Sequence, residues 1–168
     1  MGAYQGAAAF KRISNVIDKK IKILDDINLP SLIIKNSDIV FKNVAFRYES
    51  INEKAIKNIS FNVKGNSITA FVGHSGAGKS TIINLLPRFY DPQEGTIKID
   101  DQDITKISLK SLRENISMVS QDIILFDDTI KNNIAYAKEN STQDEITRAC
   151  KFAAADEFIE KLPKKFDT

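Results

Sequence analysis

The spacing of hydrophobic residues changes along the chain, and each change predicts a different kind of element. Between residues 10 and 24, apolar residues recur every three or four positions, as expected for one stripe of a helix: Phe10, Ile13, Ile17, Ile21 and Leu24. Basic residues surround the stripe: Lys11, Arg12, Lys19, Lys20 and Lys22. The pattern fits two interpretations equally: a membrane-proximal segment on a cytoplasmic surface, or a helix that packs on its own domain.

Strand patterns follow this first helix. The segment "INLPSLIIKNSD" predicts a linker, because Pro30 cannot continue a helix. From Asp38 onward the period changes to two, so "IVFKNVAFRY" and "ISFNVK" are predicted strands, and "GNSITAFVG" is a predicted buried strand after a turn.

Helical patterns dominate the second half of the chain. We expect a helix from about Lys79 to Pro87, a short strand pair in "GTIKIDDQDI", and a brief helix followed by a strand in "SLKSLRENISMVSQD". The tail "STQDEITRACKFAAADEFIEKL" is predicted to be helical, with Ser141 or Thr142 as its cap and acidic residues in its first turn. Alternating strands and helices indicate an α/β domain with an added antiparallel β layer.

Composition narrows the classes of protein. A chain of 168 residues is long enough for one domain with its own core. A net charge of +2 does not indicate the basic surface that is typical of nucleic-acid-binding proteins. Cys150 is the only cysteine, which excludes an intramolecular disulfide and favours a reducing compartment. No apolar run is long enough to cross a membrane, so we expect the isolated chain to be soluble.

One stretch carries specific chemistry. "GHSGAGKS" fits the phosphate-loop pattern G-x-x-x-x-G-K-[ST], lying between an apolar strand pattern and a helical one. Without Cβ atoms at Gly76 and Gly78, the backbone can curl so that successive N–H groups point at a phosphate. Lys79 supplies a positive charge for the β- and γ-phosphates, Ser80 a hydroxyl for Mg²⁺, and Thr81 a hydroxyl for the α-phosphate. His74 occupies a free position of the motif and receives no chemical role.

Hydrolysis also needs a carboxylate that holds Mg²⁺, and two strand-like stretches end in acidic residues. "TIKIDD" ends in Asp100 and Asp101. Because Lys98 lies in its middle, a surface hairpin is favoured over a buried strand. "IILFDD" ends in Asp127 and Asp128, and on its pattern alone Asp127 is the better candidate for the metal.

Several stretches together resemble the nucleotide-binding domains of exporter-type ABC transporters, most closely the lipid A exporters of the MsbA type. They are "FKNVAFRY", "GHSGAGKST", "PRFYDPQEGTIKIDDQDI" and "LKSLRENISMVSQDIILFDDTIKNNIAYA", in the family's order from about Asp38 to the last residue. The resemblance implies an α/β P-loop ATPase core with an antiparallel β subdomain and the start of the helical subdomain. It implies that residues 38–168 are the N-terminal part of this domain, and that residues 1–37 are the cytoplasmic end of the last transmembrane helix and a linker.

The resemblance also assigns roles to single residues. Tyr48 would stack on adenine, and Gln121 would contact Mg²⁺ and the attacking water and couple the site to the membrane domain. ATP would be held by Tyr48 and by the loop residues Gly73, His74, Ser75, Gly76, Ala77, Gly78, Lys79, Ser80 and Thr81; Lys79 and Gln121 would be catalytic, and Ser80 and Gln121 would bind the metal. The same alignment places Asp100 at a β-turn and "IILFDD" after Gln121. Asp101 stands where the family generally has glycine, and aspartate tolerates a left-handed turn. Ser120 replaces a proline common in the superfamily, although the lipid exporters often have serine there.

The resemblance further implies the partners and place of action: a transmembrane domain, a second nucleotide-binding domain, and the cytoplasmic face of the membrane. The family's Ser-Gly-Gly-Gln signature, Walker B aspartate, catalytic glutamate and switch histidine do not occur in the printed sequence. We therefore expect negligible hydrolysis by the isolated chain, and either marginal stability or association with another copy or with the missing half.

Three other interpretations stay open at this point. The chain could be a self-contained P-loop kinase or NTPase that uses Asp127 for magnesium, although no guanine-selecting Asn-Lys-x-Asp run is present. It could belong to a soluble ABC ATPase, which the exporter-like "FKNVAFRY" and the basic first helix disfavour. It could also act only as a binding module or scaffold.

Overall fold

The computed structural model describes residues 10–11, 13–14, 16–19, 21–120, 122–138 and 140–168. It divides the chain into two compact units, which meet in sequence between Met118 and Val119. No helix among the described residues has the length and apolar character that a membrane span requires.

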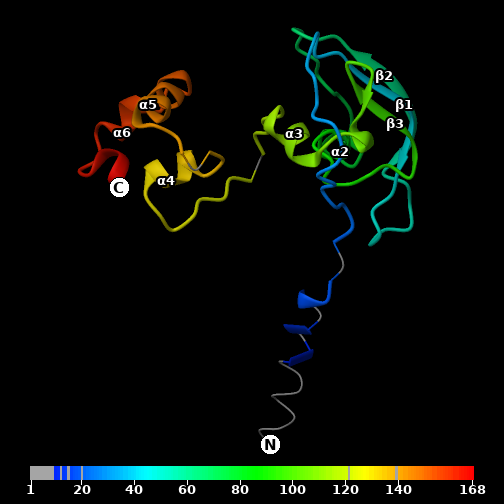
Figure 1. The fold of residues 1–168 in the computed structure, drawn as a ribbon, viewed down its shortest axis with the longest axis horizontal. Coiled ribbons are helices and arrows are strands. Elements are labelled where there is room, and N and C mark those ends of the chain that lie inside the picture. The colour runs from blue at the N-terminus through cyan, green and yellow to red at the C-terminus, as the bar shows by residue number, and fades with distance from the viewer. Residues whose placement is uncertain (1–9, 12, 15, 20, 121, 139) are drawn as a thin grey trace, which may run out of the picture. The chain divides into compact units, whose positions relative to one another are not determined.

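The first unit is built on a four-stranded antiparallel sheet (Figure 1). Its strands are β1 (Ile39–Phe46), β2 (Ile56–Val63), β3 (Glu94–Ile99) and β4 (Gln102–Asp103), in the order β2-β1-β3-β4. These bounds confirm the strands predicted from the alternating stretches on either side of residue 50 and the strand pair in "GTIKIDDQDI". In β2 the half-buried residues alternate with exposed ones, as expected for a strand with one covered face.

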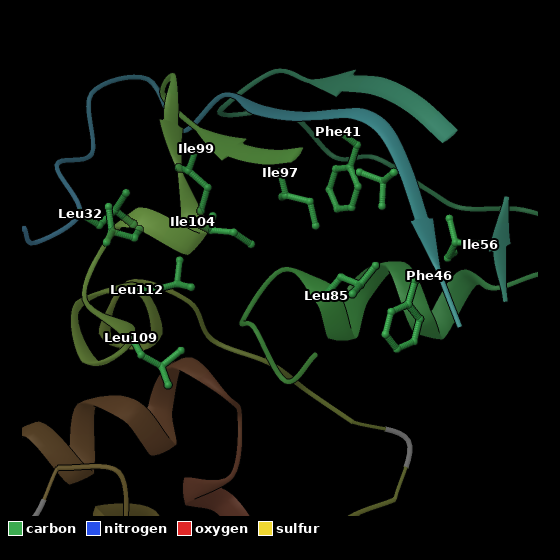
Figure 2. Packing of buried hydrophobic residues seen from close by; sticks show 12 residues of the cluster. Leu32, Phe41, Phe46, Ile56, Leu85, Ile97, Ile99, Ile104, Leu109 and Leu112 are labelled. Carbon is green, nitrogen blue, oxygen red and sulfur yellow. The ribbon is translucent and has the colours of Figure 1, made fainter. Parts of the chain in front are cut away.

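One hydrophobic core joins the sheet to its helices. It lies where α2 (Lys79–Leu85), the short helix η1 (Ile104–Lys106) and α3 (Leu109–Glu114) pack against the sheet (Figure 2). Leu85 of α2, Ile97 of β3 and Leu112 of α3 are almost completely buried. The cluster consists of Leu32, Phe41, Val44, Phe46, Ile56, Leu85, Ile97, Ile99, Ile104, Ile107, Leu109 and Leu112.

The helix predicted between residues 10 and 24 is shorter in the structure. Residues 10–11, 13–14 and 16–17 are helical, whereas residues 21–24 are not. Phe10, Ile13 and Ile17 of the apolar stripe are all more than half exposed. A helix this short gains little stability without packing of its apolar face, which accounts for its early end.

The buried strand predicted in "SITAFV" and the strand predicted after "SLRE" are both wrong. Residues 67–74 and 116–120 are neither strand nor helix, and Ile68, Val72 and Val119 are more than nine-tenths exposed. A strand exists only when a neighbour completes its hydrogen bonds, and no described residue forms such a ladder with either segment. The sequence pattern shows that the two segments are apolar, but it does not show whether a neighbouring strand is present to pair with them.

The second unit is a small group of helices: α4 (Ile130–Ala135), α5 (Gln143–Phe152), α6 (Asp156–Ile159) and η2 (Lys165–Asp167). Ile146, Cys150 and Ile159 form its buried centre. Thr142 and Glu145 make the capping box of α5, which confirms Thr142 as the cap. The Lys138 ammonium and the Thr142 backbone N–H lower the pKa of Glu145 to about 2.

Two carboxylates, those of Asp25 and Asp100, tie the segment before β1 to the rest of the first unit. Asp25 accepts hydrogen bonds from the first backbone N–H groups of α3, those of Leu109 (2.8 Å) and Lys110 (3.2 Å). Asp100, in the turn between β3 and β4, accepts from four successive N–H groups, from Lys35 (2.6 Å) to Asp38 (3.0 Å). These bonds, that of Lys35 first, lower the pKa of Asp100 below its ordinary value of 3.8. The linker predicted between residues 27 and 38 is thus irregular but ordered.

We predict that Asp100→Asn lowers the melting temperature of the chain at neutral pH. Because the folded-state pKa of Asp100 is depressed, its contribution to stability is present above the unfolded value near 3.8 and is lost as pH falls through the folded value. The melting temperatures of Asp100→Asn and wild type should therefore converge as the pH is lowered below 3.8. Asp101→Asn, in the same turn, serves as the control. A constant difference between Asp100→Asn and wild type down to the lowest pH at which both fold would contradict this role.

Candidate phosphate loop and aromatic cluster

The candidate site begins with the turn between the extended segment 67–74 and α2. Gly76 and Gly78 have positive φ angles of 79° and 85°, so both need the left-handed region that the sequence predicts for glycine here. The Ala77 N–H donates to the His74 carbonyl (3.2 Å), and the Ile82 N–H donates to the Gly78 carbonyl (3.0 Å), where the helix starts. The predicted loop is therefore closed by its own backbone and followed directly by a helix.

Lys79 lies over this loop. Its Nζ donates to the carbonyl oxygens of Gly73 (2.9 Å) and His74 (2.7 Å). An ammonium group held by two neutral carbonyls can exchange them for phosphate oxygens, which are stronger acceptors. The chemistry and position of Lys79 thus suit a phosphate ligand on the loop.

Gly78 also lies close to the start of β2. A Cβ atom at this position would lie 2.6 Å from the Ala55 carbonyl oxygen and 3.0 Å from Ile56 Cδ1. At Gly76, in contrast, no atom lies within 4 Å of the added Cβ. Glycine is therefore needed at the two positions for different reasons. At position 76 only the positive φ angle requires it, whereas at position 78 a side chain would also collide with the start of β2.

The structure places Tyr48 next to the phosphate loop. Tyr48 follows the end of β1, and its hydroxyl donates to Thr81 Oγ1 (3.1 Å), inside the first turn of α2. Its ring packs edge-on against Phe46 (4.8 Å between centroids) and Tyr90 (5.1 Å). Residues that are 33 positions apart in sequence are thus brought into one site.

A cleft of about 880 Å³ opens beside Tyr48. The end of β1, the segment from Arg88 to Gln93 and several residues between positions 16 and 23 line it, together with Arg113. Two of its cations have acidic partners within the cleft: Arg88 pairs with Asp91, and Lys22 with Glu49. The aromatic rings and the surplus of basic side chains suit an aromatic ligand that carries negative charge.

Each pair of alternative carboxylates has its own surroundings. Asp100 is occupied by backbone N–H groups of the linker, so it is a structural residue, and Asp101 has the left-handed conformation expected of it, with φ 64°. Asp127 and Asp128 are exposed in a loop of the second unit, where Asp128 accepts a hydrogen bond from Asn132. Gln121 lies outside the described residues, and its metal-binding and catalytic role stays a prediction. Among the described residues, no group of three or more acidic, histidine or cysteine side chains could hold a metal ion.

Sequence reasoning missed the residues that hold the turn before β3. Arg88 is buried, has φ 53°, and makes a two-bond ion pair with Asp91 (2.8 and 2.9 Å). Gln93 hydrogen-bonds the backbone of Arg47, the residue before Tyr48. The spacing of Arg88 and Asp91, three positions apart in a turn, could have suggested their ion pair. No local pattern indicates that Gln93 bonds to the backbone of a residue 46 positions away.

We predict that Gly78→Ala destabilises the chain more than Gly76→Ala. Gly76→Ala should cost about 1 kcal/mol for the left-handed conformation alone. Gly78→Ala adds the clash with the Ala55 carbonyl and should cost roughly 2 kcal/mol or more. Denaturant unfolding of both variants and wild type measures the difference. Equal free energies of unfolding for the two variants would show that α2 does not depend on this close approach.

Comparisons with known proteins agree with the geometry. The family model described as "ABC transporter" matches residues 56–167. The chain is 46% identical over 164 residues to the ATP-dependent lipid A-core flippase of Desulfotalea psychrophila, a match that covers 98% of the chain and 28% of the flippase. It is 43% identical over 164 residues to the ATM1-type heavy metal exporter of Novosphingobium aromaticivorans, covering 98% of the chain and 27% of the exporter.

A solved structure gives the same result for the fold. The structure of a bacterial Atm1-family ABC exporter with ATP bound matches with a TM-score of 0.86 and 42% identity, covering 98% of this chain and 29% of that one. The chain therefore spans less than a third of the length of these relatives. It has part of the α/β P-loop ATPase fold, including the antiparallel β subdomain described above. The chain belongs to the ABC transporter family and resembles the nucleotide-binding domains of its exporters.

Proposed function

We propose that this chain binds Mg-ATP and is the ATP-binding portion of an exporter for a lipid or another hydrophobic substrate. One observation carries the binding site: the phosphate loop and Tyr48 meet through the hydrogen bond between Tyr48 and Thr81. A single ligand with an aromatic base and a phosphate chain would reach both groups. The names of the relatives, a lipid A-core flippase and a heavy metal exporter, support export but differ in the substrate.

Each residue of the site has a separate task in this proposal. The backbone N–H groups from Gly73 to Thr81 surround the phosphates, and Lys79 exchanges its two carbonyl partners for phosphate oxygens. Ser80 and Gln121 bind Mg²⁺, which neutralises the charge of the phosphates when it is bound. Tyr48 stacks on the adenine ring in the cleft beside it.

Coupled transport requires more than these residues. In the proposal, ATP binding brings two nucleotide-binding domains together, and hydrolysis separates them at the cytoplasmic face of the membrane. A transmembrane domain selects the substrate. The signature, Walker B and switch residues, which the printed sequence does not contain, come from the remainder of the transporter and from its second nucleotide-binding domain.

We predict that Lys79→Ala weakens Mg-ATP binding by at least about tenfold, because it removes a charge-assisted hydrogen bond to the phosphates. Isothermal titration of the 168-residue chain with Mg-ATP gives the dissociation constants. Lys57→Ala, on an exposed position of β2, is the matched control and should bind as wild type does. Equal affinities for Lys79→Ala and wild type would contradict the proposed site.

The rival P-loop enzyme makes a different prediction for Asp127. If Asp127 held the magnesium, Asp127→Asn would abolish the magnesium dependence of nucleotide binding. We expect Asp127→Asn to leave this dependence unchanged, because Asp127 is exposed and belongs to no described group of acidic, histidine or cysteine side chains that could hold a metal ion. We also expect wild type to release no more phosphate from ATP than Lys79→Ala does, since several catalytic groups are lacking together. Phosphate release above that control would contradict this assignment.

A further inference from the structure

The side chain of Gln93 pairs with the backbone just before Tyr48 through two hydrogen bonds. The Arg47 N–H donates to Gln93 Oε1 (2.7 Å), and Gln93 Nε2 donates to the Arg47 carbonyl (3.1 Å). The backbone N–H of Gln93 also donates to the Ala45 carbonyl (3.1 Å). A glutamine amide has the donor and acceptor of a peptide group, so it can pair with a backbone as a neighbouring strand does.

This contact continues the sheet beyond the last residues of its strands. β1 ends at Phe46 and β3 begins at Glu94, with Ala45 opposite Glu94. The side chain of Gln93 therefore supplies Arg47 with the two hydrogen bonds that a longer β3 would have supplied. The backbone that leads into Tyr48 is fixed by this pair of bonds.

The ring of Tyr48 also packs against Tyr90. Hydrogen bonds and an ion pair stabilise the turn that contains Tyr90. Arg113 donates to the carbonyls of Pro87 (3.0 Å) and Arg88 (3.0 Å), and Asp91 pairs with the buried Arg88. Gln93 follows this turn closely, so one segment supplies both the Tyr90 ring and the Gln93 amide. Backbone and ring of Tyr48 are thus constrained together.

We infer that Gln93 is a positioning residue of the nucleotide site, which holds Tyr48 in the orientation that receives the base. This inference rests on the proposed function for the role of Tyr48 but not for the contact itself. No described hydrogen bond joins the Gln93 side chain to the phosphate loop, and we infer that Gln93 acts through Arg47 and Tyr48. Its loss should therefore affect binding of the base and leave binding of the phosphates unchanged.

The chain offers a matched control for this experiment. Gln102 of β4 makes the same pair of bonds with another backbone: the Ile33 N–H donates to its Oε1 (3.0 Å), and its Nε2 donates to the Ile33 carbonyl (2.6 Å). Gln93→Met and Gln102→Met each remove one such pair and retain the length of the side chain. Only the first lies beside Tyr48.

Two measurements on wild type and both variants test the inference. In the nucleotide-free chain, NMR contacts between the rings of Tyr48 and Tyr90 should be lost in Gln93→Met and retained in Gln102→Met. In titrations, Gln93→Met should weaken Mg-ATP binding by about tenfold, the equivalent of one or two hydrogen bonds, and leave Mg-tripolyphosphate binding as in wild type. Gln102→Met should leave both affinities unchanged.

The outcomes separate this inference from the proposed function. Intact Tyr48–Tyr90 contacts in Gln93→Met, or an equal loss of ATP and tripolyphosphate affinity, would overturn the positioning role. If wild type binds neither ligand, the proposed function fails, and the ring contacts alone decide the role of Gln93. If wild type binds both ligands equally, stacking on Tyr48 fails, and the ring contacts again decide.

Discussion

The packing of α2 against the antiparallel sheet is the interaction on which the rest of the site depends. Thr81 and Leu85, one turn apart on the helix, are buried together, and Leu85 belongs to the same core as Phe46, Ile56 and Ile97 (Figure 2). Burial of one leucine stabilises the structure by about 2 kcal/mol, and this burial also fixes the axis of the helix. The phosphate loop enters that helix at Gly78, against the Ala55 carbonyl, so the sheet sets where the loop can lie.

The same packing explains why the two ends of the candidate site meet. Phe46 is a core residue at the end of β1, and Tyr48 follows it by two positions, within reach of Thr81. The turn that holds Tyr90 is fixed by the buried Arg88 and its partner Asp91. Apolar contacts in the core thus set the position of Tyr48, and the polar contacts of Arg88 hold the turn that carries Tyr90.

Local sequence patterns predicted the elements that are determined by residues close together in the sequence. Alternation predicted β1 and β2, glycine spacing predicted the loop, and Thr142 with Glu145 marked the start of α5. The pattern of residues 67–73 failed as a strand because a strand depends on a neighbour, which no local pattern contains. Gln93 and Asp100 could not be assigned for the same reason, since their partners lie 46 and 62 to 65 positions away. The proposal that Tyr48 stacks on adenine came from the family resemblance, whereas the structure shows that Tyr48 lies next to Thr81.

In our proposal, one nucleotide engages both the backbone between Gly73 and Thr81 and the ring of Tyr48. Amide and ring resonances of the folded chain, followed by NMR during a Mg-ATP titration, test it most directly. We expect both sets of signals to shift along the same saturation curve and the signals of the Asp100 turn to stay unchanged. Unmoved loop amides at millimolar nucleotide, in a sample that is folded throughout, would contradict it.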